Sequence, residues 1–253
     1  MRLPERWSEA LAPVLERRVL LALLVIVAGL WAIFGLADEI REGEQFRLDR
    51  AILLLFRNPA DPSDPIGPGW VESAVRDVTA LGGTVVISLI TIAATGFLFL
   101  SGKRGAALFV VAAIAGALLL SFGMKAGIER ARPDLVPHGV IVYTASFPSG
   151  HATGSAATYL TLSALLARFQ PRRRLKIFIL AFGVTLTFLI GLSRIYLGVH
   201  WPSDVAAGWT LGACWALLCW LVARWLQRRG TVERTGEQQP DEPRPAHVIP
   251  GPP

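Results

Sequence analysis

Residues 19–36 read VLLALLVIVAGLWAIFGL, an apolar run without a charged residue. A helix rises 1.5 Å per residue, so about 20 such residues cross the roughly 30 Å hydrocarbon core of a bilayer. The run exceeds the roughly 7 to 15 apolar residues of a secretory signal core. We therefore interpret it as an uncleaved transmembrane helix, although the GLA at 35–37 resembles a signal cleavage site.

The rest of the chain has the same character, with 53% hydrophobic and 17% charged residues. Such a composition lies outside the range of ordinary soluble domains. Five further windows are long enough to span a bilayer: 79–100, 105–127, 152–169, 175–192 and 205–226. The sequence therefore predicts an all-α polytopic membrane protein, a bundle of six transmembrane helices.

Basic residues gather before the first predicted helix, in the links after the second and fourth, and after the sixth. In a six-helix chain these four segments share one side, which the positive-inside bias makes cytoplasmic. Both termini are then cytoplasmic, and the other three links face the extracytoplasmic side. The net charge of +6 does not indicate nucleic-acid binding, because the basic residues lie at helix ends rather than on one face.

These patterns divide the chain into five parts. We expect a cytoplasmic N-terminus, a first transmembrane helix, an extracytoplasmic segment with an interfacial helix at 46–57, a core of helices two to six, and a disordered cytoplasmic tail. Their ranges are 1–18, 19–37, 38–78, 79–226 and 227–253.

The first motif lies at the predicted end of helix three, where Lys125 precedes Arg132 by seven residues. Seven residues are about two turns, so both cations would project from one face if the helix continued as far as Pro133. Snorkelling, or positive charge at a helix C-terminus, explains the pair equally well. Arg130 is expected to point elsewhere and is left outside the site.

The second motif is SFPSGHA at 146–152, directly before helix four. The turn at Ser149 and Gly150 presents backbone N–H groups and a hydroxyl at a helix N-terminus, an arrangement that binds phosphate. Ser149 also suits a simple N-cap. His151 goes beyond that role, because an imidazole beside an anion-binding turn is a candidate proton donor.

The third motif joins helices five and six through Arg194, His200 and Asp204. An aspartate four residues after a histidine is able to orient the imidazole and leave its other nitrogen free for attack. An acidic residue in a first helical turn is favourable in any case. One carboxylate among three cations suits neither Mg²⁺ nor Ca²⁺, and histidines near cations are poor Zn²⁺ ligands. No metal is expected.

Taken together, the three motifs resemble those of the type 2 phosphatidic acid phosphatase superfamily. They match K-x6-R-P at Lys125–Pro133, P-S-G-H at 148–151, and S-R-x5-H-x3-D at Ser193–Asp204. The resemblance covers residues 79–226 and fits the six-span membrane members. It implies a phosphatase core in the last four to five helices.

The resemblance also implies a role for each residue. His200 attacks phosphorus to form a phosphohistidine, Asp204 orients it, and His151 protonates the leaving oxygen and then activates water. The residues implied to hold the phosphoryl oxygens are Lys125, Arg132, Ser149, Gly150 and Arg194. Positioning and charge compensation suffice for such a transfer, so no cofactor is implied.

The expected substrate is a lipid phosphate or diphosphate that reaches the site from the bilayer. Undecaprenyl diphosphate, phosphatidic acid and phosphatidylglycerophosphate all fit, and the composition favours a bacterial inner (plasma) membrane. A phosphotransferase using the same site is the nearest alternative. A transporter or channel and a structural membrane protein with wetted helix ends are the others; against a transporter, the charged residues cluster in links and not in mid-helix.

Overall fold

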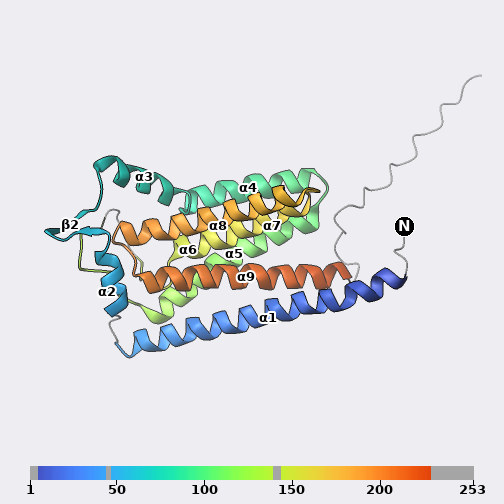
Figure 1. The fold of residues 1–253 in the computed structure, drawn as a ribbon, viewed down its shortest axis with the longest axis horizontal. Helices are drawn as coiled ribbons and strands as arrows, with labels where there is room; N and C mark the ends of the chain where they lie inside the picture. The colour runs from blue at the N-terminus through green and yellow to red at the C-terminus, as the bar shows by residue number, and fades with distance from the viewer. Residues whose placement is uncertain (1–4, 44–46, 139–143, 229–253) are drawn as a thin grey trace, which may run out of the picture.

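Long helices lying side by side dominate the computed structural model, which describes residues 5–43, 47–138 and 144–228 (Figure 1). The helices are α1 (Glu5–Arg41), α2 (Arg47–Leu54), α3 (Gly69–Ala80), α4 (Thr84–Leu100), α5 (Arg104–Ile128), α6 (Gly150–Ser155), α7 (Thr161–Arg168), α8 (Arg173–Tyr196) and α9 (Pro202–Arg228). A π-helical segment, η1 (Ala156–Leu160), joins α6 to α7. Most of the tail predicted at 227–253 lies outside the described residues.

Four helices of the described ranges are long and apolar enough to cross a membrane: α1, α5, α8 and α9. The pair α3 and α4, bent by 45°, would be a fifth span. The window 152–169 is divided into α6, η1 and α7, so it offers no single long helix. The chain is thus an all-α polytopic membrane protein, with four or five such spans where the sequence predicts six.

The lipid-facing character of the bundle is visible in its exposed side chains. Large apolar residues such as Trp31, Val85 and Phe178 are more than half exposed along the helices. In water a surface of this kind would be unfavourable, whereas hydrocarbon tails cover it without loss. The exposed faces therefore agree with a bilayer as the surrounding solvent.

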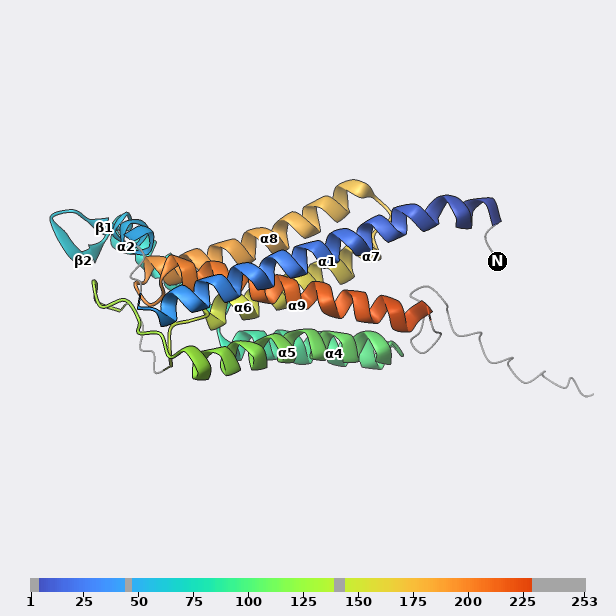
Figure 2. The same cartoon turned by 90° about the horizontal axis from the view of Figure 1, so that it is seen from below.

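The centre of the bundle is α9, which contacts α1, α5, α6 and α8. Figure 1 shows α9 between α1 and α5, and in Figure 2, seen from below, α1 crosses in front of α9. Glycines allow its close approach to α6: a Cβ at Gly208 would lie 2.7 Å from the carbonyl oxygen of Ser149, and one at Gly212 would lie 2.5 Å from that of Thr153. Small residues at these two positions thus set the α6–α9 distance.

The second predicted span is broken at its start. A turn at residues 81–83 separates α3 from α4, so Thr79 and Ala80 belong to α3 and not to α4. Gly82 permits this geometry, because a Cβ there would lie 2.3 Å from Cγ2 of Ile190 and 3.3 Å from Cδ2 of His151. The break therefore brings backbone against the second motif.

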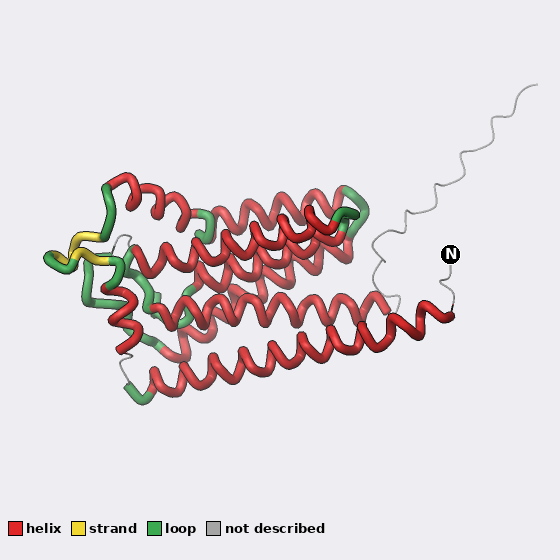
Figure 3. Tube along the Cα trace, in the orientation of Figure 1, coloured by secondary structure: helices red, strands yellow, loops and turns green. Residues whose placement is uncertain are grey.

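One end of the bundle carries all three motifs, and we refer to it as the site end. There α5 and α8 end, α6 and α9 begin, and α2 packs with two short antiparallel strands, β1 (Arg57–Asn58) and β2 (Asp61–Pro65). Figure 3 shows these loops gathered at the left of the view, opposite the α4–α5 and α7–α8 links. The helix predicted at 46–57 is thus shorter than expected and is followed by a hairpin.

Candidate active site

The first motif does not lie on one helical face. Helix α5 ends at Ile128, and Glu129 adopts a left-handed conformation with φ of 50°, so Arg132 lies in the following loop. The two cations meet through the chain at 144–146 instead. Lys125 Nζ donates to the carbonyl oxygen of Ala145 at 2.6 Å, and Arg132 Nε donates to that of Thr144 at 2.8 Å. The predicted proximity holds, but its predicted cause is wrong.

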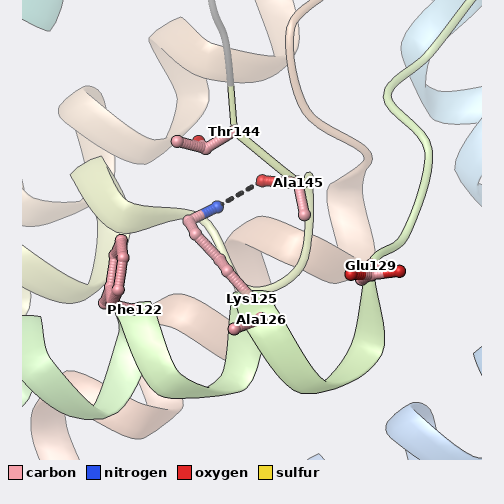
Figure 4. Close-up of a pocket in the computed structure, with 6 residues that line it drawn as sticks. All are labelled: Phe122, Lys125, Ala126, Glu129, Thr144 and Ala145. Atoms are coloured by element: carbon pink, nitrogen blue, oxygen red, sulfur yellow. Dashed lines mark hydrogen bonds between the residues drawn. The ribbon is translucent and has the colours of Figure 1, made fainter.

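An open groove lies beside Lys125 (Figure 4). Its lining residues come from the end of α5 and from the chain that approaches the second motif: Phe122, Lys125, Ala126, Glu129, Thr144 and Ala145. The Lys125 amine points toward Ala145 across this groove, while the exposed ring of Phe122 forms part of its wall. A positive charge and an apolar surface are therefore adjacent at the site end.

The second motif forms the start of a helix, as predicted. Ser149 is the N-cap of α6, and its Oγ accepts from the backbone N–H of Ala152 at 3.5 Å. The backbone N–H of Ser149 donates to the carbonyl oxygen of Asp204 at 2.9 Å, which ties the turn to α9. The first N–H groups of a helix have no acceptor inside it, so the amides of Gly150 and His151 are available to an anion.

The third motif places a buried histidine between a carboxylate and a guanidinium. His200 is 2% exposed and Asp204 is fully buried. The distance from His200 Nδ1 to Asp204 Oδ2 is 3.4 Å, and the same oxygen accepts from the backbone N–H of Trp201 at 2.9 Å. On the other side of the ring, Nε2 lies 3.2 Å from Nη1 of Arg132.

The surroundings of His200 keep its imidazole neutral. Burial lowers its pKa to about 3, and the positive charges of Arg132 and Arg194 act in the same direction, while Asp204 opposes them. Burial also lowers the pKa of Arg132, which remains a cation. With the proton assigned to Nδ1, facing Asp204, the lone pair of Nε2 is directed toward Arg132 and the space in front of it.

Arg194 is 3% exposed, and its Nη1 donates to Thr79 Oγ1 at 2.9 Å. Its Nε is buried and has no hydrogen-bond partner among the described residues. Within the described ranges, no carboxylate forms an ion pair with Lys125, Arg132 or Arg194. Buried charges normally have a counter-ion. We refer to these three residues as the cation cluster, whose composition suits a bound anion.

His151 completes the group of predicted residues. Its ring lies against the α3–α4 turn, where a Cβ at Gly83 would be 3.9 Å from His151 Nε2. The positive charges of Arg194, Arg132 and Lys125 act on it electrostatically. The structure thus brings together all eight residues that the sequence singled out, from two links and four helices.

The prediction that Arg130 points away from the site is wrong. Because α5 ends at Ile128, the helical-face argument does not apply to it. Its guanidinium pairs with Asp204 Oδ1 at 2.5 Å and with Asp49 Oδ2 at 2.8 Å. Both partners are buried.

Three further residues were missed: Ser146, Thr79 and Asp49. The Ser146 hydroxyl donates to Asp204 Oδ2 and lies 3.3 Å from His200 Nδ1. Ser146 opens the quoted SFPSGHA stretch, so proximity to the motif was a usable signal. Thr79 and Asp49 carried no such signal, because tertiary packing alone brings them to the site end.

The fold and the site define a polytopic membrane protein in which two histidines lie beside three cations at one end of the bundle. The model of the PAP2 superfamily matches residues 106–228. Phosphatidylglycerophosphatase B of Bacillus subtilis is 34% identical over 149 residues, 56% of this chain and 70% of the relative. Lipid A 1-phosphatase of Rhizobium etli is 29% identical over 195 residues, 66% of this chain and 76% of the relative.

A solved structure agrees with these relatives. The transmembrane PAP2 type phosphatidylglycerolphosphate phosphatase from Bacillus subtilis superposes with a TM-score of 0.64 at 27% identity, over 78% of this chain and 96% of that one. The chain belongs to the PAP2 superfamily, and it is a hydrolase of phosphoester bonds. Both relatives are named as phosphatases, which favours hydrolysis over the transfer and transport alternatives.

Proposed function

We propose that this protein is an integral membrane phosphatase that hydrolyses a lipid phosphate or diphosphate through a phosphohistidine at His200. One observation carries the proposal: the His200 imidazole is buried, with Nδ1 facing the Asp204 carboxylate and Nε2 facing the Arg132 guanidinium. A nucleophile held by a carboxylate and aimed at a cation is suited to attack a bound phosphate.

In the first step, Nε2 of His200 forms a bond to phosphorus while the bond from phosphorus to the lipid oxygen breaks. His151 gives its proton to the departing oxygen, and Asp204 stabilises the positive charge that develops on the His200 ring. In the second step, His151 takes a proton from water, whose oxygen attacks phosphorus and breaks the nitrogen–phosphorus bond. The products are the dephosphorylated lipid and inorganic phosphate.

The cation cluster supplies the charge that phosphoryl transfer needs. Lys125, Arg132 and Arg194 compensate the equatorial oxygens, and the Gly150 amide adds a donor at the start of α6. Ser149 uses its oxygen as the N-cap acceptor, so its own hydrogen is free to point at a phosphoryl oxygen. These groups need no metal ion or cofactor.

A lipid is the substrate class that the setting supports best. The groove beside Lys125 is open, and the exposed Phe122 ring borders it, so the phosphate can bind while its tails stay in hydrocarbon. The two relatives compared above are named for phosphatidylglycerophosphate and lipid A. Undecaprenyl diphosphate, phosphatidic acid and phosphatidylglycerophosphate are the candidates.

The proposed topology keeps six spans, with the bent pair α3–α4 as the second and α6–η1–α7 as the fourth. The basic links α4–α5 and α7–α8 lie at the end opposite the site, together with the beginning of α1 and the end of α9. The positive-inside bias then makes both termini cytoplasmic. The site end would face the extracytoplasmic side of the plasma (inner) membrane.

The test is a phosphate-release assay on the purified protein in detergent with EDTA, using the three candidate lipids and a soluble phosphate ester. We expect release from at least one lipid, and His200→Gln should reduce it at least about 10³-fold. His138→Gln is the matched control, because His138 bonds only the carbonyl oxygen of Pro133 among the described groups. A ³²P-labelled lipid should yield an acid-labile, base-stable phosphoprotein.

Three results would count against the proposal. They are activity on the soluble ester alone, loss of activity in EDTA, and wild-type turnover by His200→Gln. A His138→Gln variant that fails as badly as His200→Gln would indicate that loss of fold, rather than loss of the nucleophile, explains the result.

A further inference from the structure

A second group of charges lies behind Asp204, on the side away from His200. Asp49, on α2, is 4% exposed, and its Oδ2 pairs with Arg130 Nη2 at 2.8 Å. Arg130 Nη1 pairs with Asp204 Oδ1 at 2.5 Å. We refer to Asp49, Arg130, Ser203 and Asp204 as the carboxylate cluster, which links the short helix α2 to the first turn of α9.

Ser203 connects Asp49 to Arg130 a second time. Its backbone N–H donates to Asp49 Oδ1 at 2.8 Å, and its hydroxyl donates to Asp49 Oδ2 at 2.5 Å. Arg130 Nη1 also donates to the Ser203 hydroxyl, at 2.7 Å. Asp49 therefore accepts a hydrogen bond from one of the free N–H groups at the start of α9. A negative charge at this position stabilises the N-terminus of the helix.

The charge balance of the carboxylate cluster bears on His200. A pair of Arg130 and Asp204 alone would be neutral, and the guanidinium would draw carboxylate charge away from the imidazole. Asp49 supplies a second negative charge to Arg130, so the cluster as a whole keeps one. That remaining charge stabilises the imidazolium that forms when Nε2 of His200 bonds to phosphorus.

We propose that Asp49 is a positioning residue, which acts through Arg130 and Ser203 to orient Asp204 and preserve its charge. This inference rests on the function proposed above, in which Asp204 orients the nucleophile. Among the described residues, the hydrogen-bond partners of the Asp49 carboxylate are Arg130 and Ser203, and neither His200 nor the cation cluster is among them. Its effect should therefore fall on kcat, while the KM for the lipid stays close to that of the wild type.

The experiment compares Asp49→Asn with Asp61→Asn, using phosphatidic acid in detergent micelles as the probe. Asp61 is the matched control, because its exposed carboxylate lies in the same 38–78 segment and, among the described residues, accepts hydrogen bonds only from Ser63. We expect Asp49→Asn to lower kcat about ten-fold, within the range for coupled neighbours, and Asp61→Asn to leave it unchanged. Asp49→Glu, which restores the charge, should recover part of the loss.

A double-mutant cycle separates positioning from general loss of structure. If Asp49 acts through Arg130, Asp49→Asn will have little further effect on kcat in an Arg130→Gln background. Independent contributions would instead multiply, and that result would overturn the proposal. So would a wild-type kcat for Asp49→Asn.

Ser203→Ala offers a second approach should Asp49→Asn not be recovered folded. It removes the hydroxyl shared by Asp49 and Arg130 while both charges remain, and a kcat below that of the wild type is expected. A wild-type kcat for Ser203→Ala would then contradict the proposal. Failure of the proposed phosphatase function can be told apart from failure of the Asp49 proposal. In the first case the wild-type protein would release no phosphate from any lipid, or His200→Gln would remain active.

Discussion

The site end holds two groups of charges that differ in how they are balanced. In the carboxylate cluster, Arg130 lies between two buried aspartates, so its charge is compensated inside the fold. In the cation cluster, no carboxylate of the described residues pairs with its three members. Charge in the first group is thus compensated by partners that hold Asp204 in place, whereas charge in the second group is, on the proposed function, compensated by the phosphate.

Substitution of Arg194 should have the largest effect on the difference between the two clusters. If the cation cluster serves an anion, Arg194→Gln should lower kcat/KM for the lipid about 10²- to 10³-fold, as loss of one preorganised donor to a transition state does. Thermal unfolding should change little or move to higher temperature, because an uncompensated buried charge is removed. The measurements are steady-state kinetics and a melting curve in the same detergent.

Arg76→Gln is the control for Arg194, since Arg76 forms an exposed ion pair with Glu72 on α3. It should retain wild-type kcat/KM, because exposed pairs contribute at most about 1 kcal/mol. An Arg194→Gln variant with strongly reduced stability and unaltered kcat/KM would assign Arg194 to structure and remove the distinction between the two clusters.

A glycine pair tests the packing that holds the clusters next to each other. Gly208→Ala places a Cβ 2.7 Å from the carbonyl oxygen of Ser149, so the start of α6 must move away from α9. We expect a loss of about 1 to 3 kcal/mol in the free energy of unfolding, together with reduced kcat, since overpacked cores show such losses. Denaturant titration and phosphate release measure the two effects.

Gly96→Ala is the matched change. Gly96 lies within α4, and a Cβ there meets nothing within 4 Å, so alanine should raise stability by about 0.5 to 1 kcal/mol through helix propensity. Activity should stay at the wild-type level. Equal effects of the two substitutions would show that close α6–α9 contact does not govern the site.

The pH dependence of stability is the smallest of the expected effects. It tests the protonation state of His200 directly. Its pKa is lowered from 6.5 to about 3 in the folded protein, so below pH 6.5 the unfolded chain binds a proton that the folded chain does not. Stability should therefore fall as pH decreases, by about 2 kcal/mol between pH 7.5 and pH 5. Melting curves at the two pH values measure this loss.

His200→Gln should lack this contribution and lose less stability over the same interval. If His200→Gln and the wild type lose stability equally, the imidazole is not held neutral by its burial. Inorganic phosphate should reduce the wild-type loss, because a bound anion offsets the charges of Arg132 and Arg194.

The sequence predicted the membrane class, because the apolar windows are long enough to span a bilayer. It also predicted that the motifs meet at one end, because successive links between spanning helices alternate between the two sides of the membrane. It misjudged Lys125 and Arg132, since it could not show that the chain leaves the helix at Glu129. Because α5 ends before Arg130, this side chain points toward Asp204 and not away from the site. Asp49 lies 155 residues from Asp204 in a segment without a motif, so its role depends on tertiary packing that periodicity does not encode.

The turn between α3 and α4 has a consequence for selectivity. Gly82 and Gly83 present bare backbone to His151, the proposed proton donor to the departing oxygen. Peptide groups that lack side chains offer little to distinguish one alcohol from another. On this flank the enzyme would recognise the phosphate and tolerate a range of leaving groups, so that any preference among lipids has to arise elsewhere along the path by which they enter.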